Sequence, residues 1–182
     1  FKHKVLDETT LLTKGINTAF YAPHSRHNQI TRDQFTKHGL KILAESQDAG
    51  VHLASSSDGL RLICFQGHPE YDRITLLKEY KRELQRYLNN ERPDRPNLPF
   101  NYIPSEHINK VNDHINVVLE GKDIKLFNEE LILDLTDNIW QDTARSLIQN
   151  WLGAVYQVTS YDRHTPYMDG VDPKDPSKTI LT

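Results

Sequence analysis

Residues 60–70 read Leu-Arg-Leu-Ile-Cys-Phe-Gln-Gly-His-Pro-Glu, an apolar stretch that runs directly into a glycine, a histidine, a proline and a carboxylate. The nearly continuous apolar run over residues 60–66 is typical of a strand buried on both faces of an α/β sheet. Beyond the carboxylate, apolar residues recur at helical spacing from about residue 73 to residue 89, which predicts a long helix. This order of strand, turn and helix predicts an α/β fold.

The residues before this stretch indicate further strands. Apolar runs over residues 40–45 and 51–55 each predict a strand, and the dipeptide Asp58-Gly59 predicts a hairpin turn after the second of them. Thr31 followed by Gln34 resembles a capping box that opens a short helix, which Gly39 would end. We expect residues 1–32 to be irregular.

The residues after the long helix are harder to interpret. We expect a helix near residues 128–135 and a final helix over residues 140–159, whose apolar residues recur on one side. The segment from 163 to 182 is rich in proline and aspartate and is expected to form a C-terminal arm.

The composition limits the possible functions. The chain has 182 residues, of which 26% are charged and 37% hydrophobic, with a formal net charge of −3, so there is no electrostatic argument for nucleic-acid binding. No apolar run has the length of a membrane span, and no signal-peptide pattern is present. A single cysteine excludes an internal disulfide framework, which favours a reducing, cytoplasmic setting.

The His68-Pro69-Glu70 turn carries the strongest chemical signal. Functional groups of open α/β sheets gather beyond the carboxyl ends of the strands, where this turn is expected. A carboxylate that holds one ring nitrogen of a histidine fixes its tautomer, so that the other nitrogen can accept a proton from a nucleophile. With nine histidines in the chain, a His-x-Glu pair alone is more often a surface feature, so the strand–turn–helix context decides for a catalytic pair.

Several segments in order along the chain resemble the homoserine O-succinyltransferase and O-acetyltransferase family. The segments that carry the resemblance are His3-Lys4-Val5-Leu6-Asp7, Pro23-His24-Ser25-Arg26-His27, Leu43-Ala44-Glu45-Ser46, Phe65-Gln66-Gly67-His68-Pro69-Glu70-Tyr71-Asp72, Glu79-Tyr80-Lys81-Arg82, Asn101-Tyr102-Ile103-Pro104 and Asn150-Trp151-Leu152.

The resemblance implies a class I glutamine-amidotransferase-like (flavodoxin-like) three-layer fold and a Cys-His-Glu triad. Such enzymes move an acyl group from acyl-coenzyme A to the hydroxyl of homoserine through a thioester on the cysteine, without a further cofactor. His68 would be the general base and Glu70 its orienting carboxylate, while Ser25 and Arg82 match substrate-contacting positions. The family also implies a homo-oligomer and a role in methionine biosynthesis, with acetyl- or succinyl-coenzyme A as donor and no nucleic-acid or membrane partner.

The family's cysteine and its acyl-binding region would precede residue 1. We therefore expect residues 1–162 to be the C-terminal half of a single α/β domain, whose partner is an upstream half that bears the nucleophile, on the same parent chain or on a separate polypeptide. Cys64 lies within the apolar strand and is expected to be a buried core thiol. The pattern Trp140-Gln141-Asp142-Thr143 departs from the family, as does the long segment over residues 106–137.

Other readings of the sequence remain open. A glutamine amidotransferase shares the Cys-His-Glu arrangement, and a chain without a nucleophile could also be a non-catalytic subunit. We expect no metal site, because neither His24 with His27 nor His107 with His114 has a second ligand pair at zinc-like spacing. Homoserine is the expected acceptor, and serine would fit a related pocket.

Overall fold

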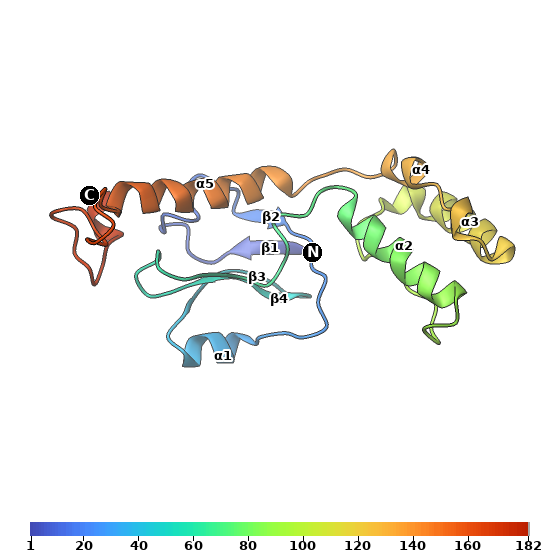
Figure 1. The fold of residues 1–182 in the computed structure, drawn as a ribbon, viewed down its shortest axis with the longest axis horizontal. Coiled ribbons are helices and arrows are strands. Elements are labelled where there is room, and N and C mark those ends of the chain that lie inside the picture. The colour runs from blue at the N-terminus through green and yellow to red at the C-terminus, as the bar shows by residue number, and fades with distance from the viewer. Residues whose placement is uncertain (182) are drawn as a thin grey trace. The chain divides into compact units, whose positions relative to one another are not determined.

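Residues 1–181 are described by the computed structural model, and within them five strands form one sheet in the order β2-β1-β3-β4-β5 (Figure 1). All four neighbouring pairs are antiparallel. The α/β class is thereby confirmed, with an antiparallel sheet. The strands are β1 Lys2–Val5, β2 Ala19–Tyr21, β3 Lys41–Ser46, β4 Gly50–Ser55 and β5 Ile63–Phe65.

The hairpin between β4 and β5 is confirmed, but β5 is shorter than the apolar run that predicted it. Oδ1 of Asp58 accepts hydrogen bonds from the amides of Leu60 (2.9 Å) and Arg61 (3.0 Å), which keeps both residues in the turn. Gly59 has a φ of +72°, a conformation that glycine adopts without steric cost. Because β5 is an edge strand, its three residues are only half-buried, so the expectation of burial on both faces is wrong.

The expectation of irregular structure over residues 1–32 is also wrong. β1 pairs with β2 through Lys2–Tyr21, His3–Phe20 and Lys4–Ala19. The predicted capping box is confirmed at helix α1, Arg32–Lys37: the Gln34 amide donates to Oγ1 of Thr31 (3.3 Å), and the Thr31 amide donates to Oε1 of Gln34 (2.8 Å).

The chain divides into two compact units, one of Phe1–Glu70 with the residues from Trp140 onward, the other of Tyr71–Ile139. In the first unit, α5 (Gln141–Val158) lies on one side of the sheet and α1 on the other (Figure 1). Leu147 of α5 packs against strand residues that include Phe20, Leu43 and Leu53, whereas Phe35 of α1 packs against Val51 and Ala54. The strongly apolar strands β3 and β4 are thus covered by helices on both faces, as their sequence requires.

The end of α5 is covered by the C-terminal segment. Ala154 and Val158 of α5 cluster with Leu60, and Tyr167, Val171 and Ile180 pack against them. The last helix, α6 (Lys178–Leu181), belongs to this segment. The boundary expected at residue 162 remains a prediction.

The second unit is helical. The predicted long helix is α2 (Thr75–Leu88), and the helix expected near residues 128–135 is α4 (Glu129–Leu133). Between them lies α3 (Ile108–Gly121), which buries Val111, Ile115 and Val118 at helical spacing and was not predicted. Short 3₁₀ turns, Ser105–His107 and Ile124–Leu126, flank α3. Among the described helices of both units, none combines the length and apolarity that crossing a bilayer requires.

Candidate active site

His68 and Glu70 come together directly after β5. Nδ1 of His68 lies 2.8 Å from Oε1 of Glu70, a hydrogen-bonding distance. Nε2 of the same ring lies 3.2 Å from the backbone carbonyl oxygen of Ser25. The Glu70 side chain is 66% exposed, so its contact with His68 contributes little to stability. What the contact does is orient the imidazole ring of His68.

The turn that carries His68 is tied to the loop after β2. The His68 amide donates to the carbonyl of Pro23 at 2.8 Å. Two residues before His68, the side chain of Gln66 accepts a hydrogen bond from the amide of Ile30 (2.7 Å). The same side chain donates hydrogen bonds to the carbonyls of Ile30 and Val51 (both 2.9 Å). These bonds fix the position of the chain as it leaves β5, and with it the position of His68. They also explain why Ser25 lies next to His68.

Gly67 is buried and lies where no larger residue fits. A Cβ at this position would lie 2.6 Å from Nε2 of His24 and 2.6 Å from Nδ1 of His52, closer than real Cβ contacts. The glycine is therefore required by the close approach of two imidazole rings, which lie behind the His68 turn.

Ser25 and Arg82 have different surroundings. Ser25 is exposed, and it contacts His68 through its backbone carbonyl; its expected contact with substrate remains a prediction. Arg82 lies on α2 in the unit of residues 71–139, where its Nε donates to Oε1 of Glu83 at 3.2 Å. The structure thus brings His68, Glu70 and Ser25 together within one unit and places Arg82 in the other.

Cys64 is half-buried, not fully buried as expected. It packs beside the Phe35, Val51 and Ala54 cluster, because the edge strand β5 leaves part of each of its side chains accessible.

The histidine pairs that were considered from the sequence, and from which no metal site was expected, are not the ones that the structure assembles. Nε2 of His114 accepts a hydrogen bond from the amide of Asn128 at 2.9 Å, just before α4. His27 is exposed, whereas His24 gathers with His3 and His52. His3 and His52 lie on strands β1 and β4, about fifty residues apart in sequence, so no local spacing could have indicated this group.

Comparison with known proteins gives one consistent result. Residues 1–161 match the family model described as homoserine O-succinyltransferase. The chain is 49% identical over 185 residues to a homoserine O-succinyltransferase from Methylobacter tundripaludum, covering 97% of this chain and 51% of the relative. It is 47% identical over 180 residues to the enzyme of that name from Thioalkalivibrio nitratireducens, with the same coverage of 97% and 51%. The chain therefore spans about half the length of the curated relatives it matches.

Proposed function

This chain belongs to the homoserine O-succinyltransferase family, and from that membership we propose that it supplies the histidine and the carboxylate of a site that transfers a succinyl group to homoserine. The observation that carries the proposal is the 2.8 Å contact between Nδ1 of His68 and Oε1 of Glu70, at the end of a strand. The acyl donor is succinyl-coenzyme A, in line with the name homoserine O-succinyltransferase that the relatives carry.

The reaction proceeds in two proton-coupled steps. In the first, Nε2 of His68 takes the proton of a cysteine thiol, and the thiolate attacks the thioester carbonyl of succinyl-coenzyme A. Coenzyme A leaves and takes the proton back from the imidazolium. In the second step His68 accepts the proton of the homoserine hydroxyl while its oxygen attacks the enzyme thioester, and the cysteine leaves as a thiol.

Glu70 serves both steps in the same way. Its carboxylate accepts a hydrogen bond from the Nδ1–H of His68, which fixes the tautomer with the lone pair on Nε2, and it stabilises the imidazolium that forms twice in each cycle. The nucleophilic cysteine lies in the half of the enzyme that this chain does not span. Cys64 is not that nucleophile, because it belongs to strand β5 and packs beside the core.

Arg82 and Ser25 contribute to binding of the acceptor. A guanidinium can hold an amino-acid carboxylate through two parallel hydrogen bonds, and the Arg82 side chain is 66% exposed. Nε2 of His68 faces the carbonyl oxygen of Ser25, which can only accept, so this contact must open before Nε2 acts as a base; a hydroxyl that then approaches Nε2 would lie near Ser25.

The remaining expectations from the family form part of the same proposal. They are the glutamine-amidotransferase-like fold of the complete domain, an upstream half that bears the cysteine, a homo-oligomer, a cytoplasmic setting, and methionine biosynthesis without a cofactor other than the coenzyme A substrate. Their common support is the family membership.

The test is an intact-mass spectrum of the enzyme after brief exposure to succinyl- or acetyl-coenzyme A. We expect a succinyl adduct on the polypeptide that bears the cysteine, and loss of that adduct when homoserine is added. The variant His68→Ala should form no adduct while keeping its circular dichroism spectrum. An adduct that forms equally well in His68→Ala would rule out the general-base role, and ammonia release from glutamine by the wild type would favour an amidotransferase.

A further inference from the structure

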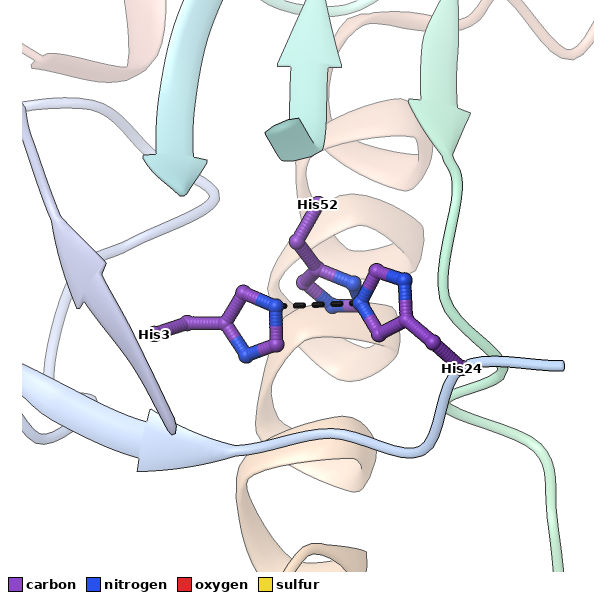
Figure 2. A group of neighbouring side chains, drawn as sticks. All are labelled: His3, His24 and His52. Carbon is purple, nitrogen blue, oxygen red and sulfur yellow. Dashed lines mark hydrogen bonds between the residues drawn. The ribbon is translucent and has the colours of Figure 1, made fainter. Parts of the chain in front are cut away.

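Three histidine side chains converge inside the first unit, apart from the His68–Glu70 pair. His3 comes from β1, His52 from β4, and His24 from the loop after β2, and Figure 2 shows their rings pointing toward one another. One ring nitrogen from each lies within 4.8 Å of those of the other two. Elements far apart in sequence therefore bring three potential ligand atoms to one point.

The hydrogen bonds of this histidine cluster are incomplete. Nε2 of His24 lies 3.0 Å from Nε2 of His3, so one of these two nitrogens donates to the other. His52 is only 1% exposed, yet neither of its ring nitrogens has a hydrogen-bond partner among residues 1–181. Leaving a buried polar group unpaired costs on the order of 1–3 kcal/mol. A ligand that accepts the lone pair of His52 would remove this cost.

The spacing of the rings fits a shared cation. In a tetrahedral zinc site with metal–nitrogen bonds of about 2.0–2.1 Å, two ligating nitrogens lie about 3.3 Å apart and their ring centres about 5 Å apart. The ring centres lie 4.9 Å apart for His3 and His24, 4.8 Å for His3 and His52, and 5.5 Å for His24 and His52. A cation would draw the ligand nitrogens together by a small motion of rings that are already in place.

We propose that His3, His24 and His52 bind one divalent cation of the zinc class. The group holds imidazoles alone, without a carboxylate or a thiolate, and this donor set suits zinc, copper, nickel and iron and disfavours magnesium or calcium. Three protein ligands leave a fourth position for water. The site is independent of the acyl-transfer proposal, because none of its three ligands is His68 or Glu70.

Neutral imidazole is the form that binds a metal ion, and the surroundings of the cluster favour it. Burial lowers the pKa of His3 to about 4, and the nearby Arg26 acts in the same direction. Burial, together with His3 and Arg26, lowers the pKa of His24 to about 3. At neutral pH the lone pairs are therefore available without the loss of a proton to solvent.

Arg26 is the competitor of the cation. Its Nη1 contacts Nδ1 of His24, and its other terminal nitrogen contacts the carbonyl of Ala49. While Nδ1 accepts from Arg26, the His24 proton resides on Nε2 and donates to His3. Cation binding moves this proton to Nδ1, so Arg26 must turn away, and its bonds to the carbonyls of Ala49 and Gln66 give it alternative partners. The positive charge of Arg26 lowers the affinity of the histidine cluster for a cation but does not prevent the cation from binding.

The histidine cluster lies next to the turn that carries His68. Gly67 separates the rings of His24 and His52 from His68 by a single residue of backbone. A cation held by those rings would make the surface behind the His68 turn rigid.

The experiment uses the intact protein, stripped with a chelator and titrated with Co²⁺ as a spectroscopic substitute for Zn²⁺. We expect one saturable equivalent with the visible absorption of a four- or five-coordinate ion. His24→Asn and His52→Asn should each weaken binding at least on the order of tenfold to a hundredfold, by analogy with the loss seen when even outer-shell partners are removed. His27→Asn is the matched control, since His27 is exposed and three residues from His24, and it should leave binding unchanged.

Absence of saturable binding by the wild type would overturn the proposal, as would equal losses in His27→Asn and His24→Asn. If the cluster variants fail to fold, the wild type alone decides the question. Long-range ¹⁵N–¹H spectra of its histidine rings with Zn²⁺ should show changes at the three buried imidazoles. Changes confined to exposed histidines would mean adventitious surface binding and would contradict the site.

Discussion

Gly67 lies so close to His24 that a methyl group on its α-carbon would stand 2.6 Å from Nε2 of that ring. The same methyl group would meet His52 at 2.6 Å, and His52 is buried among core side chains. The residue before the candidate catalytic histidine is thus determined by two other histidines, which connects the candidate active site to the core behind it.

The variant Gly67→Ala tests this relationship. Because the added methyl group must displace a ring, we expect a loss of about 1–3 kcal/mol in the free energy of unfolding, measured by urea denaturation. The control is Gly153→Ala in the middle of α5, where a Cβ would meet nothing within 4 Å in the described part of the chain. There the loss of backbone freedom in the unfolded state should stabilise the protein by about 0.5–1 kcal/mol. Equal effects of the two substitutions would contradict the packing argument.

The role of Glu70 is tested by Glu70→Gln. The amide oxygen can still accept from Nδ1 of His68, but the negative charge that stabilises the imidazolium is lost. We expect turnover to fall by about 10²–10⁴-fold, the range of a lost acid–base contribution. Because Glu70 is 66% exposed, solvent screening places the expected loss toward the lower end of that range.

The measurement for Glu70→Gln is steady-state kinetics of the intact enzyme with homoserine and succinyl-coenzyme A. Glu8→Gln, at an exposed position in the same unit, is the control and should retain full turnover. Unchanged turnover in Glu70→Gln would mean that the exposed carboxylate does not orient His68 during the reaction.

The histidine cluster makes stability sensitive to acid. The pKa of His3 is about 4 in the folded protein, because of burial first and the nearby positive charges second, against an ordinary value of 6.5. Between these values the unfolded chain binds a proton that the folded chain does not, so the stabilising term is fully present above about pH 6.5 and is lost progressively as pH falls toward 4. His24, with a pKa lowered to about 3, acts in the same direction.

Urea denaturation at pH 7, 5.5 and 4.5 measures this dependence. For His3 alone the difference in the free energy of unfolding between pH 7 and pH 4.5 amounts to about 2–2.5 kcal/mol. His3→Asn removes one of the titrating groups and should make the dependence less steep between pH 6.5 and 4.5. A wild-type stability that stays constant over this range would show that the imidazoles are solvated.

The hairpin turn before β5 depends on Asp58. Its Oδ1 accepts from the hydroxyl of Ser56 (2.7 Å) and from the two amides of the turn. Burial acts to raise its pKa, but the hydrogen bonds from the amides of Arg61 and Leu60 and from Ser56 outweigh it and lower the pKa below the ordinary value. Asp58→Ala should therefore cost about 1–3 kcal/mol of unfolding free energy, since the amide of the buried residue Leu60 loses its acceptor.

Arg61→Ala is the control for Asp58→Ala. It removes the ion pair between Nε of Arg61 and Oδ2 of Asp58, 3.3 Å apart, but leaves the amide bonds of the turn in place. Because Arg61 is 52% exposed, its loss should cost less than about 1 kcal/mol in a thermal or urea titration. A larger effect of Arg61→Ala than of Asp58→Ala would assign the stability to the contacts of Arg61, which are its ion pair with Asp58 and its hydrogen bond to the Tyr167 hydroxyl (2.9 Å).

The parts of the fold that could be predicted are those with a local cause. Three predicted features depend only on residues close by in sequence, and each is found where it was expected. They are the turn at Asp58-Gly59, the capping box at Thr31 and the apolar spacing of α2. The contact between His68 and Glu70 also follows from a two-residue separation across a proline.

The parts that could not be predicted depend on distant partners. β1 and β2 have four and three residues, too few to show an alternating pattern, and they are strands because they pair with each other and with β3. β5 is short and only partly buried because it lies at the edge of the sheet. Its apolar sequence does not indicate that edge position. His3, His24 and His52 come together only because β1 and β4 lie on either side of β3 in the sheet. A search for ligand pairs close together in sequence therefore could not find this cluster.

Arg26 provides the last prediction, because its hydrogen bond to Nδ1 of His24 and a cation on Nε2 require opposite tautomers of that ring. Arg26→Gln removes the positive charge and places an amide oxygen that can accept the proton on Nδ1 of His24. We expect this variant to bind Co²⁺ or Zn²⁺ about tenfold more tightly than the wild type, as a gain of one favourable outer-shell contact would give. Isothermal titration of the chelator-stripped protein measures the change, with Arg32→Gln, an exposed arginine paired with Glu45, as the control. Weaker binding by Arg26→Gln would mean that the guanidinium supports the cluster, and the tautomer of His24 assigned to the cation-bound state would be wrong.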